Sequence, residues 1–137
     1  MRHKVIQNDF QVLATYAGYE STKEDPNLFT IIDSNDHDRG DILIKEIPYN
    51  GKKADASNIK NLLVDVTIGL PTAKSYVKKA AKEKLYLIGK LNEFKNDKYK
   101  QKCTEADMNF MPMAFEVFGA WSKETCKLFK FLATSNS

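Results

Sequence analysis

The stretch NLLVDVTIG, residues 61–69, decides the fold that we expect for this chain. Its apolar and β-branched residues predict a buried strand. Asp65 interrupts the run, and a buried carboxylate without a partner costs several kcal/mol or takes up a proton instead. We therefore expect a specific group to meet Asp65.

Two shorter apolar runs come before this strand. The run DILIKEIPY, residues 41–49, is separated from it by a polar loop that contains Asn50 and Gly51. This spacing predicts two neighbouring antiparallel strands. The earlier run LFTII, residues 28–32, lies between two polar segments and predicts one more short strand.

The N-terminal segment has the period of a helix. Ile6, Phe10 and Leu13 follow one another at spacings of four and three within residues 5–17. This pattern predicts an amphipathic helix, and Gly18 is expected to end it.

The second half of the chain alternates between helix and strand. After Pro71, a long stretch rich in Ala, Lys, Leu and Glu predicts a helical region that ends near Ala106. Residues 109–118, NFMPMAFEVF, predict a strand that Pro112 restricts to an edge or a bulge. Ser122 is expected to cap a last amphipathic helix. The predicted order αβββαβα describes an α/β fold with a mixed central sheet flanked by helices.

The composition is that of an ordinary globular protein. With 137 residues, 42% hydrophobic and 28% charged, the chain is expected to form one domain, residues 1–137. No apolar run approaches the roughly 18 residues that suggest a membrane span, and the N-terminus does not read as a secretory signal. We therefore expect no membrane partner and an intracellular protein, nuclear if the host is a eukaryote.

The charge is distributed unevenly. The net charge is only +3, but residues 74–102 contain ten lysines against three acidic residues, a local balance of +7 that leaves −4 for the remainder. Such an asymmetry is typical of a face that binds a polyanion such as DNA, although it also occurs on lysine-rich helices that are merely solvated.

Two aspartates in the predicted sheet indicate metal chemistry. Asp41 begins one strand and Asp65 lies within the next, so their carboxylates can converge at one end of the sheet. Two such carboxylates repel each other unless a cation lies between them, and Mg²⁺ or Mn²⁺ is the hard cation that they suit. The alternative is that Asp41 caps the entrance of a strand and that Asp65 bonds to a backbone amide or a buried arginine. The residues alone leave both interpretations open.

A lysine and a tyrosine on the helical region extend this hypothesis. Lys95 and Tyr99 are four residues apart and therefore share one helix face. A lysine near two metal-binding carboxylates can orient the attacking water or stabilise charge that develops on a phosphodiester. Tyrosine on the same face can hold a phosphate or a metal ligand.

Five motifs in this order resemble a known superfamily. They are RH at 2–3, RGDILI at 39–44, LLVDVTIGLP at 62–71, KNDKYKQKC at 95–103 and FMPMAFEVFGAWSKE at 110–124. The combination resembles the PD-(D/E)XK restriction-like nucleases, and more narrowly the restriction-like endonuclease domain of site-specific non-LTR retrotransposons and related mobile-element proteins. The motifs extend over nearly the whole chain, and the last is the most specific.

The resemblance implies a restriction-endonuclease-like core and assigns roles to individual residues. Asp41 matches the aspartate of the PD motif and Asp65 the acidic residue of the (D/E)XK motif. Gly40 stands where the motif has proline, and Thr67 stands where it has the catalytic lysine. The retrotransposon-type domains place this lysine on the following helix, a position that Lys95 fits, with Tyr99 beside it.

The function expected from the sequence is that of a metal-dependent DNA endonuclease. The catalytic set would be Asp41, Asp65, Lys95 and Tyr99, with Mg²⁺ or Mn²⁺ on the two aspartates and DNA as the partner. A homodimer, or membership of a larger mobile-element protein, fits the same resemblance. The residues expected to contact nucleic acid are Arg39, Lys74, Lys78, Lys79, Lys98 and Lys102.

Three other functions stay open on the sequence alone. A Holliday-junction resolvase has the same fold and is typically small and basic. A catalytically inactive nucleic-acid-binding module would explain Gly40 and Thr67 at the two altered motif positions. An unrelated α/β domain that binds a small acidic ligand is the third.

Overall fold

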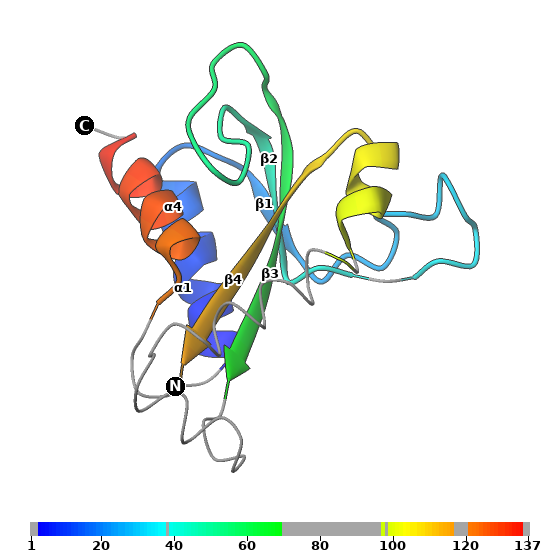
Figure 1. Ribbon diagram of the computed structural model, residues 1–137, viewed down its shortest axis with the longest axis horizontal. Helices are drawn as coiled ribbons and strands as arrows, with labels where there is room; N and C mark the ends of the chain where they lie inside the picture. Colours follow the sequence, from blue (N-terminus) through cyan, green and yellow to red (C-terminus); the bar gives the residue numbers. More distant parts are fainter. Residues whose placement is uncertain (1–2, 38, 70–96, 98, 117–120, 136–137) are drawn as a thin grey trace.

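The computed structural model describes residues 3–37, 39–69, 97, 99–116 and 121–135 (Figure 1). Residues 97 and 99–105 are helical, on the segment that leads into the last strand. The remaining elements, in chain order, are α1 (His3–Tyr16), β1 (Ser21–Lys23), β2 (Ile42–Ile47), β3 (Lys60–Gly69), β4 (Asn109–Glu116) and α4 (Lys123–Thr134).

The strands form a mixed four-stranded sheet in the order β1-β2-β3-β4. β2 pairs antiparallel with both β1 and β3, whereas β4 pairs parallel with β3. The prediction of an α/β fold with a mixed sheet is therefore confirmed, as is the antiparallel pairing of the two central apolar runs. Pro112 lies on β4, which is an edge strand of the described sheet, as predicted.

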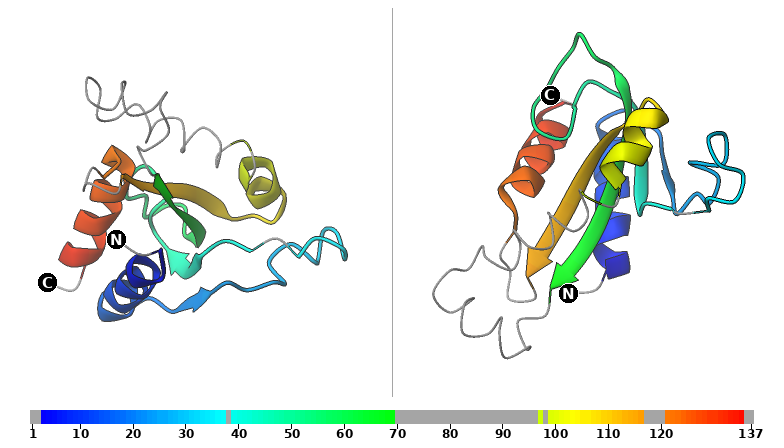
Figure 2. Two further views of the ribbon diagram at one scale, coloured as in Figure 1. Left: turned by 90° about the horizontal axis from the view of Figure 1, so that it is seen from below. Right: turned by 45° about the vertical axis from the view of Figure 1, so that its right-hand side comes forward.

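Alternation along β3 separates two layers of side chains. Leu62, Val64 and Val66 belong to the main core, which lies between the sheet and the apolar faces of α1 and α4. Leu63 belongs instead to a second cluster on the opposite face, formed by Phe29, Leu43, Leu63, Tyr99 and Cys103. Figure 2 shows α1 and the helical residues 99–105 on opposite sides of the sheet. Because side chains alternate along a strand, Asp65 and Thr67 lie on the face of the second cluster.

The prediction of a strand at residues 28–32 is wrong. Residues 26–32 form successive turns, and the first strand is the short β1, which pairs Ser21 with Ile44. Asp25 starts the turns by accepting a hydrogen bond from the Asn27 amide at 2.9 Å, and Phe29 alone is buried in the second cluster. Local turn chemistry thus outweighs the β-propensity of the apolar run, and the loop projects from the body (Figures 1 and 2).

The predicted helix ends are confirmed at two places. Gly18 follows α1 with φ of +96°, which favours glycine, and its amide donates to the Thr15 carbonyl. Ser122 caps α4 by accepting a hydrogen bond from the Thr125 amide at 3.2 Å. Of the helical region predicted between Pro71 and Ala106, only residues 97 and 99–106 lie within the described part of the chain, and 97 and 99–105 are helical.

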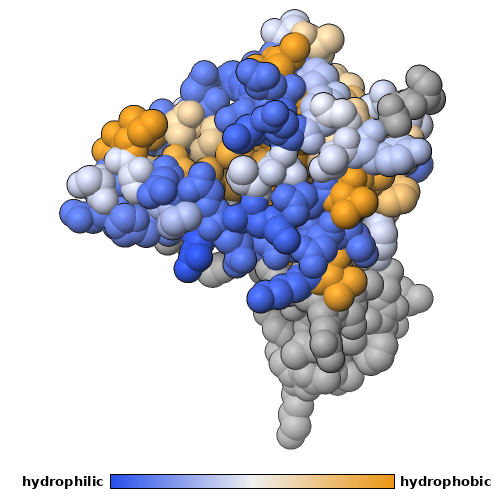
Figure 3. Space-filling view, turned by 180° about the vertical axis from the view of Figure 1, so that it is seen from behind, coloured by the Kyte–Doolittle hydropathy of each residue, from blue (hydrophilic) through white to orange (hydrophobic). Residues whose placement is uncertain are grey.

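The described surface is mainly polar. Seen from behind, it is hydrophilic with separate hydrophobic groups (Figure 3). Val5, Val12 and Tyr16 of α1 are among the exposed apolar side chains. No helix in the described ranges is both long and apolar enough to cross a membrane.

Candidate metal and nucleic-acid site

Asp41 and Asp65 lie near each other where β2 begins beside β3. The paired register of β2 and β3 ends at Ile42 and Val64, and Asp41 stands one residue before β2 with its backbone amide bonded to the Val64 carbonyl. Alternation puts Asp65 on the face of Leu63, which belongs to the second cluster. The two aspartates are nearly buried, with 8% and 4% of their surface exposed. Two carboxylates therefore lie near each other with little access to water.

The carboxylate of Asp41 reaches the backbone beside Asp65. Its Oδ2 accepts a hydrogen bond from the amide of Val66 at 2.5 Å, and its own amide donates to the Val64 carbonyl at 3.0 Å. Asp41 thus bonds to β3 on both sides of Asp65. The bond from the Val66 amide occupies one of about four hydrogen-bond acceptor positions on the Asp41 carboxylate.

The backbone of Asp41 is also fixed from the other side. Its carbonyl accepts hydrogen bonds from Gln7 Nε2 at 2.7 Å and from the Glu24 amide at 3.2 Å. Gln7 is a buried residue of α1, 34 positions away in the sequence. Three separate segments, α1, the end of β1 and β3, therefore determine where the Asp41 carboxylate lies.

Tyr99 supports the segment that leads into Asp41. Its hydroxyl donates to the carbonyl of Arg39 at 3.3 Å, while its ring stacks between Phe29 and Phe110 at centroid distances of 6.4 and 5.3 Å. Cys103 lies one turn further along the helix, where burial raises the pKa of its thiol to about 12. The thiol is therefore neutral at physiological pH. Tyr99 thus reaches the candidate site through the backbone of Arg39.

Gly40 is required by close packing against β3. A Cβ atom at this position would lie 2.3 Å from Leu63 Cδ1 and 2.6 Å from its Cγ, and Leu63 is completely buried. A larger residue such as proline would meet the same side chain. Glycine at position 40 therefore has a local steric reason.

The residues present fit a hard divalent cation. Mg²⁺ is commonly held by one or two carboxylates, several waters and a substrate phosphate. Thr67, two residues beyond Asp65 on the same face, has a buried hydroxyl that finds no hydrogen-bond partner among the described residues. Such a hydroxyl suits a water molecule of a metal's hydration shell. In the same ranges no group of three or more His, Cys, Asp or Glu side chains could hold a metal.

Several predicted site residues lie elsewhere or outside the described residues. Arg39 is exposed and adjoins Gly40 and Asp41. Lys102 forms an ion pair with Asp36 at 2.9 Å and lies over the Phe29 ring, so it takes part in holding the projecting loop. The predicted residues outside the described ranges are Lys74, Lys78, Lys79, Lys95 and Lys98.

The sequence analysis missed Gln7. On α1 it shares one helix face with Phe10 and Ala14, at spacings of three and seven, and all three are buried. A polar residue within an apolar stripe is a signal that could have been followed, because a buried amide needs a hydrogen-bond partner. The identity of that partner depends on tertiary contacts.

Known proteins add no further constraint. No protein-family model, no curated protein and no solved structure matches this chain.

Proposed function

We propose that this chain is a metal-dependent DNA endonuclease of the restriction-like type, which hydrolyses a phosphodiester bond. The observation that carries the proposal is the proximity of two nearly buried carboxylates: Asp41 Oδ2 accepts a hydrogen bond from the amide of Val66, the residue that follows Asp65. Like charges that lie close together with little access to water disfavour each other's ionised form. A divalent cation held by both groups would offset this repulsion.

The chemistry follows from the residues around this pair. A bound Mg²⁺ or Mn²⁺ supplies a Lewis acid and a more acidic water. Asp41 and Asp65 hold the ion, and Gln7, Tyr99 and the Val66 amide keep the Asp41 segment in one conformation. Fixed ligands save the reorganisation that a mobile loop would need during the reaction. Lys95, which the family resemblance assigns to charge stabilisation, keeps that role as a prediction.

One observation favours a second candidate, a nucleic-acid-binding module without catalytic activity. The hydrogen bond from the Val66 amide to Asp41 Oδ2 is what a purely structural aspartate at a strand entrance would make. Thr67 at the position of the usual lysine fits the same interpretation. The two candidates agree on nucleic-acid binding and differ in metal-dependent cleavage.

Cleavage of supercoiled plasmid DNA tests the proposal. We expect the purified chain to convert the plasmid to open-circular or linear forms with Mg²⁺ or Mn²⁺, and to lose this activity in excess EDTA, because the metal supplies the Lewis acid. A parallel assay with a four-way junction and a matched linear duplex separates a resolvase from a general endonuclease. DNA binding without any cleavage under either metal would favour the inactive module.

A further inference from the structure

We propose that a pocket at the start of β4 binds a backbone phosphate of the nucleic acid. The pocket lies between the loop after β2 and the helical residues 99–105, and its polar lining includes Asn50, Lys52, Lys100 and Asn109. The choice of nucleic acid as the ligand rests on the proposed function. The pocket itself was not among the nucleic-acid contacts expected from the sequence.

Neither lysine of this pocket forms an ion pair within the described part of the chain, although Asp97 lines the same pocket. Other lysines nearby do: Lys60 pairs with Asp107 and Lys102 pairs with Asp36, both at 2.9 Å. Lys52 and Lys100 come from different elements, yet they line one pocket, and both are exposed. Two ammonium groups that line one pocket and form no ion pair suit an anion.

The loop is built to present Lys52 at this place. The Asn50 side chain accepts hydrogen bonds from the amides of Lys52 and Lys53, at 2.9 and 3.0 Å. Gly51 between them has φ of +98°, and a Cβ there would lie 2.8 Å from the Phe110 carbonyl oxygen. The turn therefore rests directly on the beginning of β4, where only glycine permits so close an approach.

A third donor and one acid complete the lining. The side-chain amide nitrogen of Asn109 is buried and has no hydrogen-bond acceptor within the described residues. Asp97 also lines the pocket and offsets one of the two lysine charges. Counted over the described lining residues, two lysines and one aspartate leave one positive charge, which together with an amide donor fits the single negative charge of a phosphodiester.

The pocket lies at a useful distance from the two aspartates. β4 pairs Asn109 with Leu62 and Pro112 with Asp65, so three residues separate the two levels along the strands. At about 3.3 Å per residue this is roughly 10 Å. A separation of this size lets one nucleic-acid strand contact both the pocket and the aspartates.

The salt dependence of DNA binding tests this assignment. Binding of a fluorescent duplex is measured by anisotropy in EDTA, which prevents cleavage, over a series of NaCl concentrations. We expect Lys52→Gln and Lys100→Gln each to reduce the slope of log K against log[NaCl] by about one unit, because each removes one phosphate contact. Both lysines are exposed, so thermal unfolding should stay within the range of ordinary surface substitutions.

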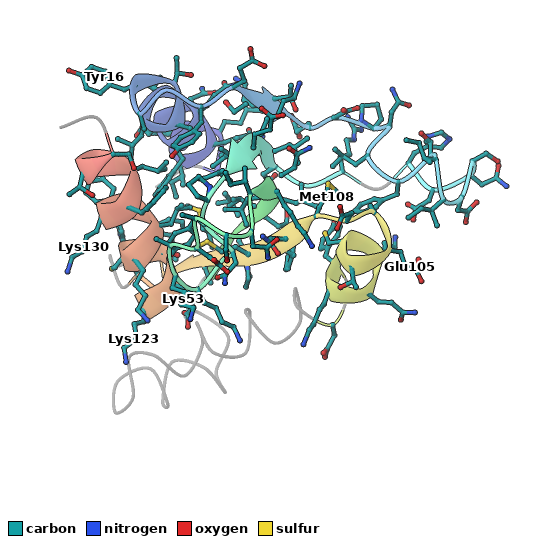
Figure 4. All side chains as sticks on the ribbon, turned by 90° about the horizontal axis from the view of Figure 1, so that it is seen from above. Tyr16, Lys53, Glu105, Met108, Lys123 and Lys130 are labelled. Carbon is teal, nitrogen blue, oxygen red and sulfur yellow. The ribbon has the colours of Figure 1, made fainter. Side chains whose placement is uncertain are left out.

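Lys53→Gln is the matched control. Lys53 follows Lys52 but does not line the pocket, and Figure 4 shows it on the side of α4, well separated from Glu105 on the helix. An equal change of slope in this variant, no change in the two pocket variants, or no DNA binding at all would overturn the assignment. Plasmid cleavage is measured separately. If the chain cleaves DNA but the slopes of the two pocket variants are unchanged, only the phosphate pocket is rejected. If the slopes change but the chain does not cleave DNA, only the nuclease proposal is rejected.

Discussion

Replacing Asp65 with asparagine is expected to lower the rate of metal-dependent plasmid cleavage by at least about a hundredfold. Loss of a residue that merely orients a metal ligand typically costs 10- to 100-fold in affinity or activity, and a ligand itself should cost no less. Asparagine keeps the size of the side chain but removes the negative charge next to Val66, whose amide bonds to the Asp41 carboxylate. The rate is measured at saturating Mg²⁺ and again at saturating Mn²⁺.

Thermal unfolding of the same variant in EDTA distinguishes a metal ligand from a structural aspartate. Without a cation, removal of one of two neighbouring carboxylates relieves their mutual repulsion, so Asp65→Asn should be at least as stable as the parent. Asp9→Asn, at an exposed position of α1, serves as the control and should change neither property. Normal cleavage by Asp65→Asn, or a clear loss of stability in EDTA, would contradict the assignment.

Replacing Gly40 with alanine should lower the free energy of unfolding by about 1–3 kcal/mol, the usual cost of overpacking a core. The added methyl group would lie 2.3 Å from Leu63 Cδ1, and the buried leucine has little room to move. A shift of the chain at residue 40 to make room for the methyl group would also disturb Asp41, the next residue. The cleavage rate should therefore fall together with stability. Urea denaturation and the plasmid assay measure the two effects.

A double-mutant cycle shows whether the contact with Leu63 is the cause. Leu63→Ala alone should cost about 2–5 kcal/mol, but combined with Gly40→Ala the total should be smaller than the sum, because the new methyl group enters the vacated space. Gly18→Ala is the control. Its cost comes from φ of +96° with no atom within 4 Å of the added Cβ, so its effect should simply add to that of Leu63→Ala. Strict additivity for Gly40 as well would show that another contact is responsible.

The sequence predicted those parts of the fold whose cause is local. The period of α1, the alternation of β2 and β3, the restriction that Pro112 places on β4 and the cap at Ser122 all follow from neighbouring residues. The prediction of a strand at residues 28–32 was wrong because a strand needs a partner, and none of the described strands lies beside this segment. β1 was missed because three polar or half-exposed residues carry no periodic signal.

The candidate site was predictable only in part, because some of its contacts join residues that are far apart in the sequence. Asp65 stood out because a charge within an apolar run needs an explanation, and the pairing of β2 with β3 then brings the start of β2, next to Asp41, beside it. The bond from Gln7 to Asp41 joins residues 34 positions apart, and the bond from Tyr99 to Arg39 joins residues 60 apart. No local pattern specifies such contacts. Asp36 pairs with Lys102 and Asp107 pairs with Lys60. Which lysines form ion pairs, and which do not, therefore also depends on tertiary contacts.

The position of a bound cation provides the most direct test of shared metal binding by the two strands. Crystals grown with Mn²⁺ and measured at its absorption edge should show an anomalous peak that lies roughly 2 Å from a carboxylate oxygen of Asp41 and of Asp65. The peak should vanish in Asp65→Asn. A map in which Mn²⁺ binds only at other positions, while Asp41 and Asp65 contact protein atoms alone, would contradict the proposed metal site.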